Sequence, residues 1–279
     1  MIPAANGKQP TYSALIRTRN SAVTLPQTLE SIRTQTIQPA EYVIVDSGST
    51  DKTLAGLSDN SLVHHFVGDS FNYSEALNQG LTHVCSDYVL VISSHTSLVN
   101  THAIAFAMRT LTGNDDIGAA YFSYTSDEPL RFDKIDATSF DGFNGLSNTC
   151  ALIRMDLLRR RPFRPEVFAA EDQEWASWLF YEEGKHVIRV SGADPRNINP
   201  ARNSVVKWFK EYVAVALYAN RRLLSLQNVA RLTLDVVRPS RPLLLRRRCL
   251  LLALALTLPL LRLIGWTRRK AAQARIPAS

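Results

Sequence analysis

Two stretches decide the fold of this chain: SALIRTRN at residues 13–20 and EYVIVDSGSTDKT at residues 41–53. In each, a short apolar run ends abruptly in small and polar residues, which predicts a buried strand followed by a turn. Between them, Thr24-Leu-Pro-Gln27 combines a capping-box pattern with a proline near the start of a helix, so a helix should run to about Thr34. Strand, helix and strand in this order predict a βαβ unit with parallel strands.

The same alternation continues to about residue 190. Ser74 is the expected cap of one further helix, and Asn100 or Thr101 of the next. The polar, aperiodic residues 125–147 predict a long loop, which in a compact domain is more often functional than decorative. The pattern as a whole predicts an α/β fold, a Rossmann-like αβα sandwich with a mostly parallel central sheet. Its further strands are expected at 62–67, 87–92, 117–124, 148–154 and 187–190, and its helices at 74–84, 103–111 and 171–183.

Charge is divided unevenly along the chain. The 279 residues carry a net charge of +7 and are 46% hydrophobic, as in a globular protein with a sizeable core. Residues 1–200 hold 16 Lys+Arg against 23 Asp+Glu, whereas residues 201–279 hold 16 against 2. So basic an end predicts contact with a polyanion, either an anionic membrane surface or nucleic acid.

Several classes of protein are disfavoured by what the sequence lacks. The three cysteines (Cys85, Cys150 and Cys249) form no CxxC pair, so neither a disulfide framework nor a structural zinc site is expected. Met1–Pro10 is polar and has no hydrophobic signal segment, which indicates a cytoplasmic location. There is no GxSxG, HExxH or Walker A motif, and no GxGxxG after the first strand.

Polar residues instead gather where the first two strands end. Thr18, Arg19 and Asn20 follow the first strand, and Asp46, Ser49 and Asp51 follow the second. In an open α/β sheet the carboxyl ends of the strands are where ligands bind. A carboxylate there can accept hydrogen bonds from a base N–H or from ribose hydroxyls, although the same residue types also make ordinary caps and tight turns.

A third polar cluster is Glu171-Asp172, at the start of a predicted helix that carries Trp175 and Trp178. The helix dipole favours an ionised carboxylate at this place, and such a group can accept a proton from an incoming hydroxyl. Plain N-capping is the alternative interpretation. The two tryptophans are expected in the core, with stacking of Trp175 on an acceptor as the alternative.

Taken together, the stretches 13–53, 71–99 and 147–176 resemble glycosyltransferase family 2, which has the GT-A fold. The resemblance implies an inverting transfer of a sugar from a nucleotide-sugar donor to a hydroxyl of a saccharide or lipid-linked acceptor, in the synthesis of cell-surface polysaccharide. The resemblance also implies that Asp172 is the general base, with Glu171 beside it. It implies in addition that the donor pocket is lined by Thr18, Arg19, Asn20, Asp46, Ser49, Asp51 and Ser93.

One departure from the family pattern concerns the metal. Family members usually carry a DxD-type motif after the fourth strand, where aspartates hold a divalent cation against the diphosphate. Here those positions read Ser93-Ser94-His95. Histidine can bind Mn²⁺ but suits Mg²⁺ poorly. Three interpretations stay open: a metal held by His95, metal-free transfer in which His95 or a nearby arginine neutralises the diphosphate, and a non-catalytic nucleotide-sugar-binding or scaffold subunit.

A second departure follows the Glu-Asp pair. No histidine occurs between Val187 and the end of the chain, where the family often has one, so Asn197 or Asn199 would be weak substitutes as metal ligands. Two minor expectations concern other residues: His64 and His65 should be structural, and Asn72 could cap the following helix or reach the nucleotide.

The C-terminal part predicts a membrane-associating helical tail. Cys249–Leu261 is apolar but too short to span a bilayer, and it is interrupted by Pro259 and Arg262. Its basic flanks, with Trp266, suit a segment on the inner face of the cell membrane. A buried helix or a dimer interface is the alternative. Nucleic-acid binding is disfavoured because leucines, not aromatic residues, are interleaved with the arginines. The predicted organisation is a flexible end at 1–11, a sugar-transfer domain at 12–212 and a tail at 213–279.

Overall fold

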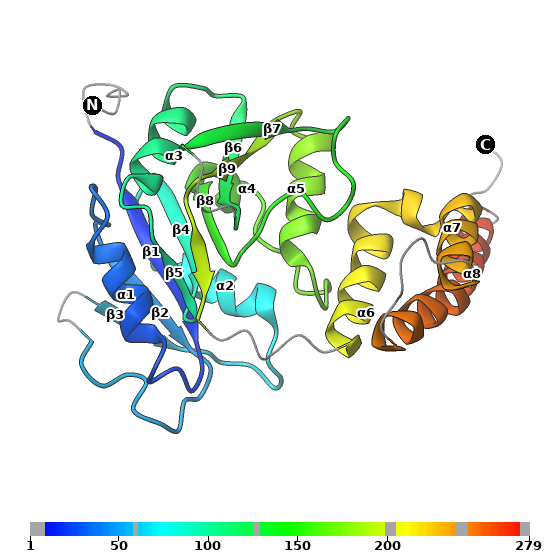
Figure 1. Ribbon diagram of the computed structural model, residues 1–279, viewed down its shortest axis with the longest axis horizontal. Coiled ribbons are helices and arrows are strands. Elements are labelled where there is room, and N and C mark those ends of the chain that lie inside the picture. Colours follow the sequence, from blue (N-terminus) through cyan, green and yellow to red (C-terminus); the bar gives the residue numbers. More distant parts are fainter. Residues whose placement is uncertain (1–8, 58–60, 125–128, 199–204, 238–244, 274–279) are drawn as a thin grey trace. The chain divides into compact units, whose positions relative to one another are not determined.

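The structure, a computed structural model, describes residues 9–57, 61–124, 129–198, 205–237 and 245–273. For residues 245–246 and 265–273 it describes the backbone alone. Most of the end predicted to be flexible, residues 1–8, therefore lies outside the described part. The chain forms two compact units, residues 1–201 and residues 202–279 (Figure 1). The domain limit predicted after residue 212 falls inside helix α6 (Val205–Ala214) of the second unit.

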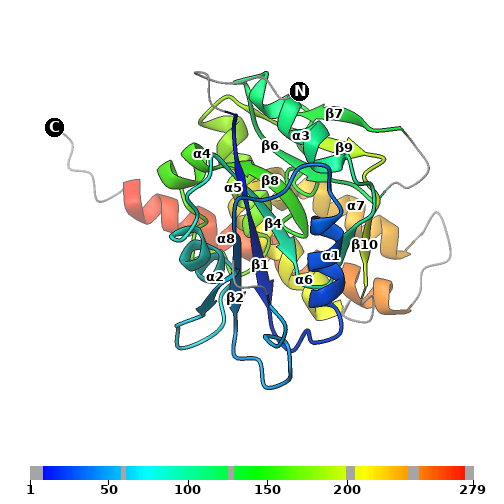
Figure 2. The same ribbon diagram turned by 90° about the vertical axis from the view of Figure 1, so that its left-hand side faces the viewer.

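A mixed sheet of eight strands forms the centre of the first unit, in the order β3-β2-β1-β4-β8-β6-β9-β7 (Figure 2). Strands β3, β2, β1 and β4 are parallel, as are β6 and β9, whereas β8 and β7 pair antiparallel with their neighbours. The predicted α/β class and mostly parallel sheet are therefore confirmed. The strands are β1 (Tyr12–Thr18), β2 (Tyr42–Asp46), β3 (Ser61–His65), β4 (Tyr88–Ser93), β6 (Ile117–Phe122), β7 (Arg131–Ile135), β8 (Cys150–Arg154) and β9 (His186–Ser191).

Helices cover both faces of this sheet. Helices α1 (Leu25–Arg33) and α3 (Ala103–Thr112) pack on the face that carries Ile16, Ile44 and Ile92. Alternate residues of the same strands point the other way, and there helix α2 (Tyr73–Leu81) lies against β1 and β2. Helices α4 (Met155–Arg160) and α5 (Glu171–Tyr181) pack on β8 and β9. The result is a three-layer αβα sandwich.

Helix α2 approaches the sheet so closely that only glycine fits at position 80. A Cβ added to Gly80 would collide with the side chain of Leu15 and would lie 2.6 Å from Cγ2 of Val45. Both side chains are completely buried. The glycine thus sets the distance between α2 and the first two strands.

Several local predictions were wrong in detail. Thr24 is the N-cap residue of α1 but makes no side-chain cap bond, since its backbone is already helical (φ −97°, ψ −36°), so the capping box is absent. The cap of α2 is Asn72 instead of Ser74: Asn72 has extended backbone angles, and its Oδ1 accepts from the N–H of Glu75 at 3.2 Å. His102 takes the N-cap position of α3, and its N–H donates to Oδ1 of Asn100.

The segment predicted as one long loop contains a strand. Within residues 125–147, β7 pairs with β9 and forms the edge of the sheet. Its side chains are mostly exposed and alternate little in polarity, so the periodicity gave no signal for it. Residues 125–128 lie outside the described part.

A second, small sheet follows β4 in the chain. It pairs β5 (Thr96–Leu98) antiparallel with β10 (Pro195–Asn197), placing Asn197 opposite Thr96. The N–H of Ile198 donates to the carbonyl of His95 at 2.8 Å. This pairing brings the segment after β9 alongside the segment after β4.

The second unit consists of helices. Helix α6 is followed by a π-helical turn (Val215–Ala219), a 3₁₀ turn (Arg221–Leu224), α7 (Leu226–Val237) and α8 (Leu245–Gln273). Their shared core contains Val213, Ala216, Leu232, Leu254 and Leu258. Pro259 lies inside α8, and the helix continues past it. Packing of Leu254 and Leu258 against the neighbouring helices offsets the loss of one backbone donor.

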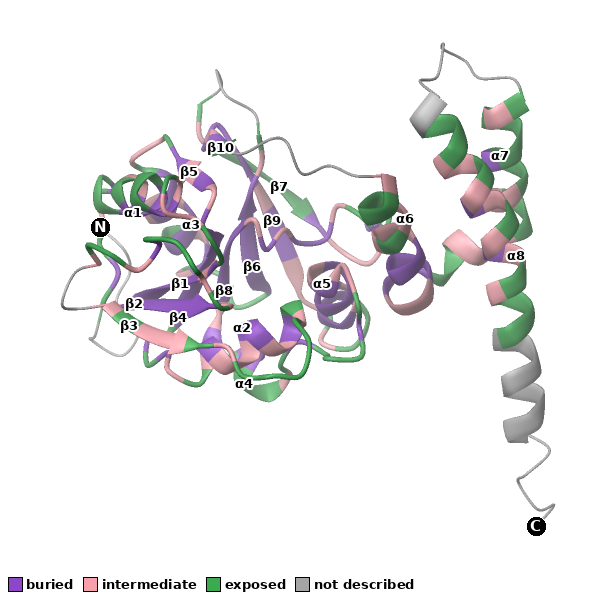
Figure 3. Ribbon diagram, turned by 90° about the horizontal axis from the view of Figure 1, so that it is seen from below, coloured by how far each residue is buried: buried purple, intermediate pink, exposed green. Residues whose placement is uncertain are grey.

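Figure 3 shows that buried residues are few in this unit and that much of α7 and α8 is exposed. Among the described residues, no helix has an apolar stretch long enough to cross a bilayer.

Candidate active site

Register places three of the predicted donor-site residues side by side at one edge of the sheet. Thr18 pairs with Asp46, and Arg17 with Ser93, at the carboxyl ends of β1, β2 and β4. The N–H of Ser93 donates to the carbonyl of Thr149, immediately before β8, which begins at this edge because it runs antiparallel to β4. The ends of these four strands therefore form one continuous border.

The turns after β1 and β2 are tied together by hydrogen bonds. Asp46 is 2% exposed and accepts from the N–H of Ser49 at 3.0 Å and from its hydroxyl. Ser49 in turn accepts from the N–H of Asn20 at 2.9 Å, and Oδ1 of Asn20 accepts from the N–H of Thr50 at 2.8 Å. Asn20 has a left-handed backbone (φ 48°), and Gly48 has φ 79°. The predicted residues are thus brought together, and one function of Asp46 is to shape its own turn.

Two further groups border this pair of turns. His65, at the end of β3, places Nδ1 3.6 Å from Oδ2 of Asp46. Asp51 accepts from the N–H of Ala22 at 3.2 Å and from the hydroxyl and N–H of Thr53. The Thr53 hydroxyl bond is the main reason why the pKa of Asp51 is lowered. Asp51 therefore joins the two turns in its ionised form. Arg19 is exposed beside them.

The segment Ser93-Ser94-His95 is closely held by its neighbours. Ser94 is buried, its N–H donates to the carbonyl of Arg17 at 3.3 Å, and its hydroxyl lies 2.9 Å from that of Ser21. His95 is partly buried and lies beside the β5–β10 pair, which carries Asn197. Asn199 is outside the described residues.

These residues do not fit a divalent cation well. The described residues contain no group of three His, Cys, Asp or Glu side chains placed to hold a metal. At the end of β4 the available donors are hydroxyls and one imidazole, whereas Mg²⁺ prefers several oxygen ligands including carboxylates.

The Glu-Asp pair opens helix α5 at the same edge. Oδ2 of Asp172 accepts from the N–H of Asn148 at 3.1 Å, and Oδ1 accepts from the N–H of Gln173 at 2.8 Å. Asp172 is partly exposed, whereas Glu171 is 6% exposed and accepts from Nδ2 of Asn148 at 3.2 Å. Asp172 is thus the member of the pair that can meet a ligand, and two N–H donors and the helix N-terminus favour its ionised form.

Side chains of α5 fix the approach to Asp172. Gln173 accepts from the N–H of Gly145 at 2.9 Å and donates to the carbonyl of Leu146, so the segment before β8 is fastened to the helix. The residue before the helix, Ala170, has a left-handed backbone (φ 56°) and provides no side-chain cap. Trp175 is completely buried and its Nε1 donates to the carbonyl of Arg161 at 3.0 Å, so it belongs to the core and does not stack on a ligand.

Buried polar atoms without a partner concentrate at this edge. Among the described residues, six buried side-chain nitrogen or oxygen atoms have no hydrogen-bond partner. Five belong to these strand ends, to the start of β5 or to the first turn of α2, where the neighbouring Tyr73 ring contacts Arg17. The sixth, Nδ1 of His186, lies at the start of β9. Such atoms are rare in folded proteins, and a cluster of them indicates a place for a ligand or water. The five residues are Arg17, Thr18, Ser74, Thr96 and Asn148.

Sequence reasoning missed Arg17 and Asn148. Arg17 lies within a run that predicts a buried strand. The signal that could have identified it as a site residue is its charge within an otherwise apolar run. Asn148 marked only the start of a strand. The structure shows that its side chain and backbone contact both Glu171 and Asp172.

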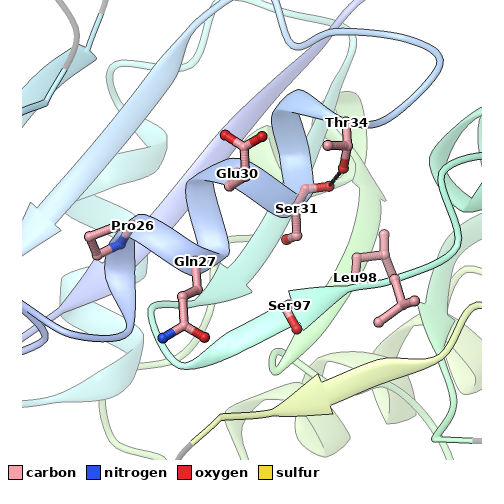
Figure 4. Close-up of a pocket in the computed structure, with 8 residues that line it drawn as sticks. Pro26, Gln27, Glu30, Ser31, Thr34, Ser97 and Leu98 are labelled. Atoms are coloured by element: carbon pink, nitrogen blue, oxygen red, sulfur yellow. Dashed lines mark hydrogen bonds between the residues drawn. The ribbon is translucent and has the colours of Figure 1, made fainter.

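A separate hollow of about 460 Å³ lies between α1 and β5 (Figure 4). Pro26, Gln27, Glu30, Ser31 and Thr34 line one side, and Ser97, Leu98 and Val99 the other. None of the predicted site residues lines it.

Part of the chain is similar in sequence to a known glycosyltransferase. A PGL/p-HBAD biosynthesis glycosyltransferase of Mycobacterium tuberculosis (strain H37Rv) is 33% identical over 103 residues, which are 34% of this chain and 40% of that protein. The match thus spans less than half of the relative's length.

Solved structures show the same fold at low identity. A mannosyltransferase from Pyrobaculum calidifontis, in complex with GDP-Man and Mn²⁺, has a TM-score of 0.58 at 17% identity and covers 97% of this chain and 86% of its own. S. aureus TarS 1-349 has a TM-score of 0.57 at 18% identity, and the match covers 75% of this chain and 65% of TarS 1-349. Glucosyl-3-phosphoglycerate synthase from Mycobacterium tuberculosis, in complex with Mn²⁺, UDP and phosphoglyceric acid, has a TM-score of 0.57 at 17% identity. The match covers 74% of this chain and 78% of the synthase.

These neighbours confirm the expected GT-A-like fold. The model of one protein family, described as glycosyl transferase family 2, matches residues 13–161, which is more than half of the chain. The chain therefore belongs to glycosyltransferase family 2.

Proposed function

We propose that this chain transfers a sugar from a nucleoside-diphosphate sugar to an acceptor hydroxyl with inversion of the anomeric configuration. The observation that carries the proposal is the common edge: consecutive strand ends join Asp46 and Thr18 on one side to Asp172 on the other. A donor bound across β1 and β4 would present its anomeric carbon toward α5. Family membership supports the same reaction class.

Each side of the edge has its own role in this proposal. The turns that carry Thr18, Arg19, Asn20 and residues 46–51 hold the nucleoside, with Ser93 below the diphosphate. Asp172 accepts the proton of the acceptor hydroxyl, whose oxygen attacks the anomeric carbon while the bond from that carbon to the diphosphate oxygen breaks. Glu171 and Asn148 keep the carboxylate of Asp172 in place.

A binding screen followed by a transfer assay tests the proposal. UDP-, GDP- and dTDP-sugars are added to the full chain, and thermal unfolding is followed. A donor at 100 times its Kd should stabilise the fold by about 2.7 kcal/mol. The stabilising donor is then incubated with saccharide and lipid-linked acceptors, and the product linkage is assigned by NMR. Binding without transfer under any metal condition would instead support a non-catalytic nucleotide-sugar-binding subunit.

We propose that the partner of the second unit is an anionic lipid surface, which would place the enzyme beside a lipid-linked acceptor on the inner face of the cell membrane. Leu252, Leu256, Leu260 and Leu263 follow one another at helical spacing on α8 and are 48–72% exposed. They lie on the side opposite Leu254 and Leu258, which pack in the unit's core. Exposed Arg247, Arg248 and Arg262 belong to the same helix. Apolar surface beside basic groups is the combination that anionic bilayers bind.

Vesicle binding separates this partner from a second copy of the chain. Leu256→Asp should reduce co-sedimentation with phosphatidylcholine/phosphatidylglycerol vesicles at least fivefold, while Gln227→Asp, which adds the same charge on α7, should not. Unchanged vesicle binding of Leu256→Asp would contradict the proposal. Loss of a dimer in size-exclusion chromatography, without any change in vesicle binding, would favour the second copy.

A further inference from the structure

Arg17 is a charged residue near the strand ends that forms no ion pair with any residue in the described part of the chain. It lies one residue before the end of β1, on the same face as Leu15, which packs beneath Gly80 of α2. Its register partner in β4 is Ser93, and its carbonyl accepts from the N–H of Ser94. Arg17 therefore adjoins Ser93 and Ser94, the first two residues of the segment Ser93-Ser94-His95 that stands in place of the DxD-type motif.

The guanidinium of Arg17 is held by an aromatic ring. Its Cζ lies 4.7 Å from the centroid of the Tyr73 ring, at the first residue of α2. Tyr73 in turn packs edge-on against Phe71, with 4.8 Å between their centroids. A guanidinium on a ring face keeps its in-plane N–H donors available for a planar or tetrahedral anion.

One N–H donor group of this side chain, Nη1, meets no acceptor in the part of the chain that the structure describes. Among the described residues, no carboxylate lies within ion-pair distance of Arg17, and its Nη1 is buried without a hydrogen bond. Leaving a charged donor unsatisfied is costly, so such a group is expected to meet an anion when the site is filled. The hydroxyl of Ser74, the residue after Tyr73, is also buried without a partner.

We infer that Arg17 binds the diphosphate of the donor and supplies the positive charge there. The segment Ser93-Ser94-His95 is poorly suited to hold a metal ion that would supply the same charge. This inference rests on the proposed function. As the bond between the anomeric carbon and the diphosphate oxygen breaks, its electron pair stays with the diphosphate. A fixed guanidinium beside that oxygen stabilises the growing negative charge. The acceptor proton goes to Asp172, as proposed above. Tyr73 acts through Arg17 and is a positioning residue.

Isothermal titration tests the inference with defined probes. UDP, GDP, dTDP, uridine, guanosine and thymidine are titrated into the full chain, with EDTA and, separately, with Mn²⁺. With EDTA present, Arg17→Ala should weaken binding of the nucleoside diphosphate about 10-fold or more, the range expected for a charge-assisted hydrogen bond, and should leave nucleoside binding unchanged. Arg17→Lys should recover part of the loss, and Tyr73→Leu should show a smaller loss with the same selectivity. Arg109→Ala, at an exposed arginine on α3, is the matched control.

Three other results of the titrations would contradict the inference or the proposed function. Wild-type affinity in Arg17→Ala, or an equal loss of diphosphate and nucleoside, removes Arg17 from the diphosphate site. Diphosphate binding by the wild type that disappears in EDTA assigns the charge to a metal and also overturns the inference. A wild-type chain that binds none of the six probes overturns the proposed function itself, and the inference with it.

Discussion

The contact between α2 and the sheet makes a sharp prediction for Gly80→Ala. Two effects oppose each other there. Alanine has a helix propensity about 1 kcal/mol better than glycine. Its methyl group, however, would collide with Leu15 and lie 2.6 Å from Cγ2 of Val45, and overpacking of a buried site costs about 1–3 kcal/mol. Neither side chain can rotate into solvent, because both are fully buried in strands.

Overpacking should therefore win. Because two buried side chains would collide with the new methyl group, the overpacking cost should fall in the upper part of its range, about 2–3 kcal/mol. After subtraction of the helix-propensity gain, we expect Gly80→Ala to lower the free energy of unfolding by about 1–2 kcal/mol, which corresponds to a Tm roughly 2–8 °C lower for a unit of this size. Urea and thermal unfolding followed by tryptophan fluorescence would measure both. Gly113→Ala is the control, because its Cβ would meet only a carbonyl oxygen at 3.3 Å. If Gly80→Ala proved as stable as the wild type, or more stable, the close packing of α2 on β1 and β2 would be refuted.

Three further substitutions test contacts within the site and in the packing of α2. Thr53→Val removes the hydroxyl that holds down the pKa of Asp51, so that pKa should rise toward its ordinary value in an NMR titration; an unchanged pKa would show that the backbone donors suffice. Because the folded pKa is depressed, the contribution of Asp51 to stability is present above its unfolded pKa and is lost as the pH falls through its folded pKa. Asn148→Ala removes the amide that donates to Glu171, and should lower kcat at least tenfold with little change in KM for the donor; a change confined to KM would contradict this. Asn78→Ala breaks two hydrogen bonds to the backbone of Phe163, of 2.7 and 3.1 Å. The free energy of unfolding, measured in urea, should fall by about 2 kcal/mol. A fall below about 0.5 kcal/mol, the scale of a surface substitution, would argue against these bonds.

The sequence predicted the strands well because their signals are local. The strand expected within residues 13–20 is β1 (Tyr12–Thr18), because an apolar run stops there sharply at polar residues. Caps were predicted less well: Thr24, Ser74 and Asn72 are all plausible caps by type, and backbone angles decide which one acts. Strand β7 could not be found, because its pairing with β9 is set by sheet geometry and leaves no apolar alternation.

The site was predictable only in part, for a related reason. Asp46 stands at the end of a strand and Asp172 at the start of a helix, and the sequence pattern alone predicts such ends. The contacts of Asn148 with Asp172, or of Arg17 with Tyr73, join residues 24 and 56 positions apart, and no local pattern encodes them. The hydrogen bonds from Ser49 to Asp46 also show that a predicted ligand residue can serve its own turn.

The most direct measurement is a paired assay of Asp172→Asn, with binding of the identified donor and transfer to its acceptor determined on the same preparation. The change keeps the shape of the side chain and removes the proton acceptor, and it leaves one of the two N–H groups that bind Asp172 without its acceptor. We expect donor affinity within twofold of wild type and a fall in turnover of at least 100-fold. Turnover close to wild type, with folding and donor binding intact, would show that another group takes the proton and would contradict the assignment of this edge as the place of sugar transfer.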